Sequence, residues 1–173
     1  NLFDTPTSLV GIIPVVTLNG SDEEATTPDA AYWSRGNGTA DGVFSLGMWV
    51  NFRDASSSTF MARFSGTDFE FQFFLDGRDR PRMYLYDGGI GTRIGEVYTT
   101  VDTFEGRWRF YVITYNGRGL NNSITLYLDG SARQTANDPN GTYTAMDDSA
   151  APTEWFARDG SSRMDGKVAG GPL

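Results

Sequence analysis

The segment from residue 108 to residue 130, WRFYVITYNGRGLNNSITLYLDG, contains two alternating runs separated by a stretch rich in glycine and asparagine. The first run places Trp108, Phe110 and Val112 on one strand face and Arg109, Tyr111, Ile113 and Tyr115 on the other. Period-two alternation bounded by turn residues predicts an antiparallel pair of strands. Asp129 followed by Gly130 suits a tight turn, because glycine adopts a positive φ without steric cost.

The same alternation recurs along the chain and predicts about ten short strands. The clearest covers residues 44–52, with Phe44, Leu46, Met48, Val50 and Phe52 on one face. Further strands are expected at residues 9–18, 59–64, 69–75, 82–86, 96–101, 153–158 and 166–169, with Phe69, Phe71, Phe73 and Leu75 pointing inward. No segment has convincing helical periodicity. Many short strands joined by turns predict an all-β fold of two packed antiparallel sheets.

Composition excludes several functional classes. The 173 residues suit a single domain spanning 1–173. A net charge of −8 disfavours nucleic-acid binding, which needs clustered Lys and Arg. The chain has neither His nor Cys, so Ser-His-Asp triads, thiolate nucleophiles, disulfides and His or Cys zinc sites cannot form within it. No run approaches the roughly 20 apolar residues of a membrane span, and we expect none.

Several motifs in these strands resemble the laminin-G-like domains of the concanavalin-A-like jelly-roll superfamily. They are Trp108 opening a strand, Tyr115-Asn116-Gly117 ending it, Tyr127-Leu128-Asp129-Gly130 after the next, Trp49-Val50, and the closing Asp165-Gly166-Lys167-Val168. The resemblance covers residues 44–168 and implies a concanavalin-A-like, two-sheet antiparallel jelly-roll sandwich. The family continues the closing segment as a strand beside the first one. Because the chain stops at Leu173, we expect that strand to be cut short.

Because the superfamily includes glycosidases, a pair of carboxylates is the first candidate for catalysis. Glycoside hydrolysis with retention needs two carboxyl groups about 5–5.5 Å apart. Asp68 and Glu70 are the one pair two residues apart in a good strand, but the glucanase motif requires a third acid, and Phe71-Gln72-Phe73-Phe74 follows instead. We therefore assign no catalytic residue and expect no enzyme. The alternative is a polysaccharide hydrolase or lyase, with Glu70 in a cleft beside a second carboxylate or a Tyr/Arg dyad.

Sugar recognition uses aromatic platforms and polar groups, because a sugar ring has an apolar face and a rim of hydroxyls. If the phenylalanines of residues 69–75 point inward, the side chains between them point outward, and we expect neighbouring strands to add to the same face. The predicted ligand-binding residues are Glu70, Gln72, Arg82, Tyr84, Tyr86, Arg109 and Tyr111, with Trp33 and Trp155 as alternative platforms in loops. The competing interpretation is that Tyr and Arg merely cover exposed sheet and that the tryptophans pack at the rim.

Calcium is the one cofactor that the resemblance implies, since laminin-G-like domains often hold one Ca²⁺ at the rim of the sandwich. Hard oxygen ligands are required. Candidate acids in loops are Asp41, Asp76, Asp79, Asp87, Asp147 and Asp148. No ligand set can be placed residue by residue, so the metal ligands stay unassigned, and solvated acidic loops are the alternative.

The resulting functional expectation is a non-catalytic recognition or structural module of a larger extracellular or virion-surface protein, as such domains occur in phage and prokaryotic surface proteins. Two roles compete within this class. One is adhesion to a cell-surface glycan. The other is assembly with neighbouring subunits, as a homo-oligomer or in capsid or tail decoration. An exposed apolar patch of more than a few hundred Å² favours assembly, whereas a concave aromatic groove with converging polar groups favours sugar.

Overall fold

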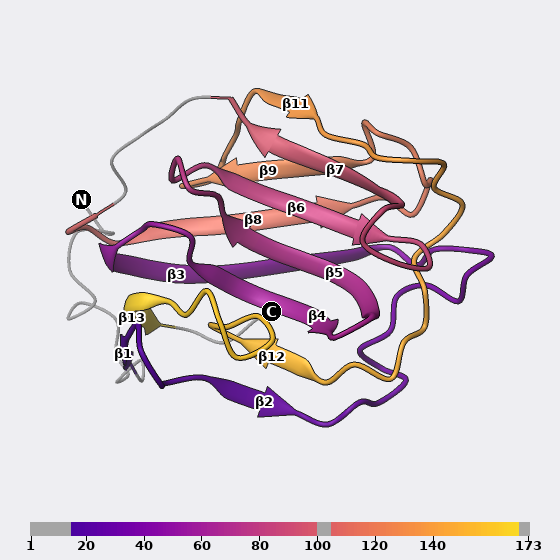
Figure 1. The fold of residues 1–173 in the computed structure, drawn as a ribbon. Coiled ribbons are helices and arrows are strands. Elements are labelled where there is room, and N and C mark those ends of the chain that lie inside the picture. Colours follow the sequence, from indigo (N-terminus) through magenta and orange to yellow (C-terminus); the bar gives the residue numbers. More distant parts are fainter. Residues whose placement is uncertain (1–14, 100–104, 170–173) are drawn as a thin grey trace.

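The computed structural model describes residues 15–99 and 105–169. These residues form two antiparallel sheets that pack face to face (Figure 1), and no helix occurs among them. The part of the chain described therefore also holds no helix that could cross a membrane. The predicted all-β sandwich of two sheets is confirmed.

Six strands form one sheet and seven form the other. The six-stranded sheet has the order β1 (Val15–Asn19), β13 (Asp165–Ala169), β3 (Phe44–Asp54), β8 (Arg109–Tyr115), β9 (Ile124–Leu128) and β10 (Ser131–Ala132). The seven-stranded sheet has the order β11 (Thr135–Asn137), β7 (Arg93–Tyr98), β6 (Pro81–Tyr86), β5 (Asp68–Leu75), β4 (Thr59–Ser65), β12 (Thr153–Trp155) and β2 (Ala25–Thr27). The closing strand β13 lies between β1 and β3.

Aromatic rings from both sheets meet at the centre of the sandwich. Phe52 and Tyr111 come from the six-stranded sheet, and Phe60 and Phe73 come from the seven-stranded sheet. The rings of Phe60 and Phe73 stack with centroids 4.3 Å apart, and Phe60 lies 5.0 Å from Tyr111. All four side chains are buried. Interdigitated rings of this kind hold two sheet faces together over a dry core.

Most expected strands form, with shifted ends. The hairpin of β8 and β9 pairs Tyr111 with Leu128 and Tyr115 with Ile124. Asp129 and Gly130 have φ values of 54° and 78°, which confirms the predicted tight turn after β9. β7 begins at Arg93 rather than at residue 96, and residues 9–14 and 100–101 of two expected strands lie outside the described part. The two- and three-residue strands β2, β10 and β11 were not predicted, because a periodicity needs a longer run.

A bulge in β5 reverses two expected orientations. Arg63 pairs with Phe71 and Phe64 pairs with Phe69, so Glu70 is an extra residue on its strand. An extra residue shifts the alternation by one beyond the bulge. Phe69 therefore packs on the outer face, with its ring centroid 4.2 Å from that of Phe64, and Glu70 points inward and is fully buried. The predictions that Phe69 faces the core and Glu70 faces outward are wrong for this reason.

Glu70 forms a buried ion pair with Arg63. Arg63 Nη2 lies 2.9 Å from Glu70 Oε1, and both side chains are fully buried. The same nitrogen lies 2.7 Å from Asp29 Oδ1 and donates to the Ser149 carbonyl at 2.9 Å. Glu70 Oε1 also accepts from the Ser149 N–H at 2.8 Å and from the Ser34 hydroxyl at 3.3 Å. Burial raises the pKa of the Glu70 carboxyl, and the Arg63 guanidinium opposes that shift. The pair thus fixes the segments around residues 29–34 and 149 to the sheet.

We expect Arg63→Met to lower the free energy of unfolding by about 3–5 kcal/mol, because it leaves the Glu70 carboxylate buried without its cation. Urea unfolding of the two proteins measures this difference. Arg63→Met/Glu70→Met removes both charges and should recover most of the loss. Arg53→Met is the matched control, since Arg53 pairs with Asp165 but is 63% exposed, and it should cost less than about 1 kcal/mol. Equal losses for Arg63→Met and Arg53→Met would contradict the assignment.

Candidate functional site

The predicted ligand-binding residues do not share one face. Gln72, Arg82, Tyr84 and Tyr86 lie on the outer face of the seven-stranded sheet, as expected, because Met83 and Leu85 fill the core. Arg109 and Tyr111 belong to β8 in the other sheet, and Tyr111 is buried in the core. Glu70 lies inside the sandwich. Alternation sorts side chains onto two faces without saying which face is inside, and both faces of β8 carry aromatic residues.

Asp68 and Glu70 do not form the cleft that the enzymatic alternative requires. Asp68 is exposed at the start of β5, whereas Glu70 is buried and bonded to Arg63. The two carboxyl groups therefore do not flank a common opening to solvent.

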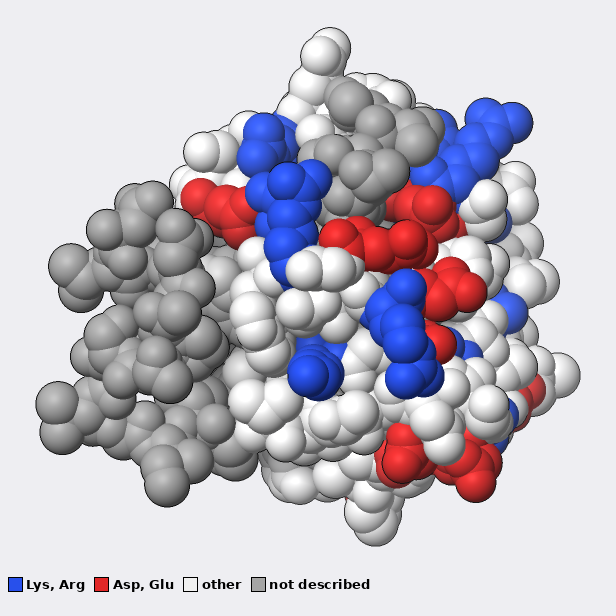
Figure 2. All heavy atoms as spheres, turned by 90° about the vertical axis from the view of Figure 1, so that its left-hand side faces the viewer, with Lys and Arg blue, Asp and Glu red and all other residues white. Residues whose placement is uncertain are grey.

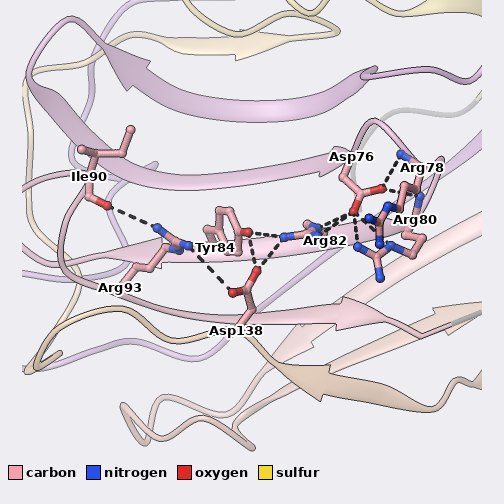
Figure 3. Close-up of polar contacts among 8 residues, drawn as sticks. All are labelled: Asp76, Arg78, Arg80, Arg82, Tyr84, Ile90, Arg93 and Asp138. Atoms are coloured by element: carbon pink, nitrogen blue, oxygen red, sulfur yellow. Dashed lines mark hydrogen bonds and ion pairs between the residues drawn. The ribbon is translucent and has the colours of Figure 1, made fainter.

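The outer face of the seven-stranded sheet carries a polar network centred on Arg82 (Figure 3). Arg82 Nε donates to Asp76 Oδ2 at 2.7 Å, and Arg82 Nη1 donates to the Tyr84 hydroxyl and to Asp138 Oδ2, each at 2.6 Å. The Tyr84 hydroxyl donates to the same Asp138 oxygen at 2.5 Å. Asp138 directly follows β11, so the network joins the edge of the sheet to its middle. These groups satisfy one another and hold the surface rigid.

The Tyr84 ring is covered from within the protein. Gly95 lies opposite Tyr84 on β7, and a Cβ there would come within 2.4 Å of Tyr84 Cδ1, so only glycine lets the ring lie across that strand. The Arg93 guanidinium sits 4.3 Å above the ring centroid. Tyr86 is buried beside Phe64 and Phe69. Neither tyrosine therefore offers an open ring face to a sugar.

Trp33 and Trp155 pack against each other at the rim. Their rings meet edge to face with centroids 5.5 Å apart, and Trp155 belongs to the core cluster. Tyr32, which is 65% exposed, packs on Trp33 at 5.2 Å. Both tryptophans therefore pack at the rim, as the competing interpretation of the sequence holds, and neither presents a free ring face to a ligand.

The outer face of the six-stranded sheet carries the aromatic platform that the other face lacks. Trp49 on β3 pairs with Phe110 on β8, and both point outward because Met48, Val50 and Tyr111 fill the core. Their rings stack with centroids 5.1 Å apart and an interplanar angle of 27°. Both side chains are half-buried, so they stay accessible to a ligand.

A groove of about 700 Å³ opens over this ring pair. Its described lining consists of Trp49, Asn51, Gly106, Arg107, Trp108, Arg109, Phe110, Asp129 and Gly130. Asp129 is fixed at its edge, because it accepts from the Phe110 N–H at 2.9 Å and is ion-paired with Arg109. An aromatic floor with polar groups at its edges is the usual build of a small-molecule site.

Sequence reasoning predicted only Arg109 among the residues of this groove, although a signal was present. The outward side chains of residues 45–51 are Ser45, Gly47, Trp49 and Asn51. A tryptophan among small and polar neighbours has no core partner to explain it. The other signal was Phe110, which the alternation placed on the face opposite Arg109 and Tyr111, and that face was not considered as a binding surface.

Three of the six candidate calcium ligands, Asp41, Asp76 and Asp87, are hydrogen-bonded within the protein. Asp41 accepts from the hydroxyls of Tyr115 and Tyr143 and from the Met146 N–H. Asp87 accepts from the Thr144 N–H at 2.6 Å. Among residues 15–99 and 105–169, no group of three or more His, Cys, Asp or Glu side chains gathers as a metal would require.

Charge is evenly mixed at one end of the sandwich. Figure 2 views the left-hand side of Figure 1, and acidic and basic side chains alternate across it. Ion pairs of the molecule include Arg53 with Asp165 at 2.6 Å and Arg80 with Asp76 at 2.8 Å. The net charge of −8 is therefore not concentrated on this side.

Asp76 is the most strongly hydrogen-bonded carboxylate of the network. Oδ1 accepts from the N–H groups of Arg78 and Arg80, and Oδ2 accepts from the side chains of Arg80 and Arg82. Burial opposes ionisation, but these bonds outweigh it and lower the pKa of Asp76 from 3.8 to about 2. Because the folded pKa lies below the unfolded one, ionised Asp76 stabilises the fold above about pH 4, and the contribution is lost as the pH falls through about 2.

We expect Asp76→Asn to flatten the dependence of stability on pH between about pH 5 and about pH 2, by about 2 kcal/mol. Urea unfolding across this range measures the slope. The control is Asp68→Asn, which removes an exposed carboxylate from the start of β5 and should leave the slope unchanged. A wild-type slope in Asp76→Asn would show that the network does not depend on this ionisation.

Comparison with known proteins gives one family match. A laminin-G family model, described as the concanavalin A-like lectin/glucanases superfamily, matches residues 19–170. The comparison with curated proteins finds no match. A similar solved structure is domain 4 of AbnA, a GH43 extracellular arabinanase from Geobacillus stearothermophilus, in complex with arabinotriose. It is 14% identical in sequence, with a TM-score of 0.49, and the match covers 98% of this chain and 87% of that chain.

Proposed function

The chain belongs to the concanavalin A-like lectin/glucanases superfamily, and we propose that it is a non-catalytic recognition domain that binds a glycan in the groove of the six-stranded sheet. The observation that carries this proposal is the stacked, outward-facing pair of Trp49 and Phe110 on the floor of that groove. Trp108 adds a third aromatic ring to the lining.

The chemistry of the groove suits a sugar. The C–H face of a sugar ring packs on an aromatic ring, while its hydroxyls seek donors and acceptors around the rim. Asn51 and Asp129 supply such groups beside the rings, and Asp129 is already oriented by Arg109. The volume of about 700 Å³ lies within the range of roughly 300–1,000 Å³ typical of small-molecule sites. The groove is thus large enough for a short stretch of a polysaccharide.

The lining supports binding rather than cleavage. Asp129 is the one carboxylate among the described lining residues, and glycoside hydrolysis generally uses two. A hydrolase or lyase of the same fold remains the alternative. Incubating the intact protein with each bound polymer and assaying new reducing ends and unsaturated products tests it. Product formation would replace the binding proposal with an enzymatic one.

The setting that we propose is a larger extracellular or virion-surface protein in which this domain contacts a cell-surface glycan. Assembly with neighbouring subunits, as in capsid or tail decoration, is the competing role. The groove favours glycan adhesion because polar side chains border its aromatic floor, whereas an assembly interface has a fully buried and more apolar centre.

We expect Trp49→Ala and Phe110→Ala each to weaken glycan binding by roughly tenfold or more, about 1.4 kcal/mol, because each removes half of the stacked platform. A polysaccharide panel first identifies a bound polymer, and isothermal titration calorimetry then compares the variants. Tyr32→Ala is the matched control, since it removes an exposed aromatic residue from the rim and should leave the affinity unchanged.

Wild-type affinity in both groove variants would overturn the assignment of the site. Loss of binding in Tyr32→Ala alone would move the site to the rim. Concentration-dependent dimerisation that is abolished by Trp49→Ala, with no polymer bound, would favour assembly over adhesion.

A further inference from the structure

The outer face of the seven-stranded sheet carries two arginines that lack a close carboxylate. Arg82 is held by Asp76 and Asp138, but Arg93 Nη2 is 3.9 Å from Asp138, whose bonds to Arg82 are shorter. Arg158 has no carboxylate within ion-pair distance among the described residues. In a chain with a net charge of −8, two such guanidinium groups on one face are unexpected.

Both arginines are fixed in place. Arg93 exchanges two backbone hydrogen bonds with Asn140, at 2.7 and 2.9 Å, and Arg158 exchanges two with Ser161, both at 2.8 Å. Arg93 then lies over the Tyr84 ring at 4.3 Å, and Arg158 over the Phe64 ring at 5.2 Å. Stacking uses the face of a guanidinium group and leaves its N–H groups to acceptors in its plane. Of the Arg93 N–H groups, Nη1 donates to the Ile90 carbonyl at 3.4 Å (Figure 3).

Two further donors lie between the arginines. Gln72 is 1% exposed, and its Nε2 has no hydrogen-bond partner, while its Oε1 lies 3.5 Å from Arg158 Nη1. Tyr86 pairs with Arg93 across the β6–β7 ladder. Its ring centroid lies 6.0 Å from that of Tyr84, which carries Arg93, and 6.0 Å from that of Phe64, which carries Arg158. Burial raises the pKa of the Tyr86 hydroxyl, so the group stays protonated and can donate.

Arg93 Nε is also buried without a hydrogen-bond partner, so it is a second unsatisfied donor beside Gln72 Nε2. A buried donor that is left unpaired costs about 1–3 kcal/mol. A carboxylate would satisfy several of these donors at once, as would a sulfate, because each presents oxygens in the geometry that a guanidinium edge matches. The nearest acid does so only at the limit of an ion pair, because Asp138 uses Oδ2 for Arg82 and Tyr84 and its Oδ1 stays 3.9 Å from Arg93 Nη2.

We propose that Gln72, Tyr86, Arg93 and Arg158 form an oxyanion site, which binds the carboxylate or sulfate group of an acidic glycan. Naming a glycan as the carrier rests on the proposed function, whereas the oxyanion site itself does not. The site lies on the outer face of the seven-stranded sheet, whereas the Trp49 groove lies on the outer face of the six-stranded sheet. The domain therefore holds two sites of different chemistry. Sequence reasoning placed Gln72 and Tyr86 on this face but did not include Arg93 or Arg158.

The first experiment uses sodium sulfate and sodium glucuronate as probes, with sodium chloride at the same ionic strength as the reference. Chemical-shift changes of the Gln72 side-chain amide and the Arg93 Nε–H report the site directly. We expect both probes to move these signals and chloride to leave them in place. A response to sulfate alone, or to glucuronate alone, identifies which of the two anions the site takes. No response to either probe beyond that of chloride would overturn the proposal.

The second experiment compares acidic polymers with neutral ones. Polygalacturonate and dextran sulfate are titrated into wild type and into Arg93→Gln/Arg158→Gln, with galactan and dextran as uncharged references. We expect the double variant to lose roughly tenfold or more in affinity for an acidic polymer. Arg118→Gln is the matched control, because it removes an exposed loop arginine and should have no such effect. If Arg118→Gln lost as much affinity for the acidic polymer, the loss would reflect net charge alone and would overturn the proposed site.

Gln72→Glu keeps the proposal testable if the double variant folds poorly. The new carboxylate would pair with Arg158 from within, so we expect a higher melting temperature and loss of the response to sulfate and glucuronate. A lower melting temperature with unchanged anion binding would overturn the proposal. Trp49→Ala should leave the anion response intact, so failure of the groove and failure of the oxyanion site are distinguishable.

Discussion

The arrangement of the seven-stranded sheet depends on the buried ion pair between Arg63 and Glu70. Neither charge would be stable in the interior alone, because desolvation of a single buried ion costs several kcal/mol. Arg63 donates to Asp29 and to the Ser149 carbonyl, and Glu70 accepts from Ser34 and from the Ser149 N–H. The pair so fixes two long connections to one end of the sheet. The pair is possible only because the bulge in β5 turns Glu70 inward to meet Arg63.

The same bulge shapes the surface outside. By turning Glu70 inward it turns Phe69 outward, where the ring joins Phe64 and Tyr86 in a second aromatic cluster. That cluster supports Arg158, just as Tyr84 supports Arg93. Tyr84, one of the rings predicted to bind a sugar, thereby supports a cation instead. The two outer faces of the sandwich consequently differ, with open aromatic rings on the six-stranded sheet and hydrogen-bond donors on the seven-stranded sheet.

The fold could be predicted because its main signal is local. Residues 44–52 and the hairpin of residues 108–128 alternate along their strands, and the two strands of the hairpin pair as expected. The candidate sites could be predicted only in part. Gln72, Arg82, Tyr84 and Tyr86 were assigned to the correct face, since Met83 and Leu85 mark the inside. Glu70 was misplaced because a bulge leaves no mark in the pattern of residue types, and Tyr111 because a buried tyrosine alternates just as an exposed one does.

The sequence by itself determined that this protein is a two-sheet β sandwich without histidine or cysteine chemistry, and the concanavalin A-like kind came from the resemblance of its motifs. That information lies in residue types and their period, which neighbours along the chain are enough to express. Only the tertiary structure decided which face of each strand meets water. It stacked Trp49 on Phe110 and brought Arg93 and Arg158, 65 positions apart, to the two sides of Gln72 and Tyr86. Such pairings depend on strand order and register, and these follow from the packing of the whole core rather than from any single segment.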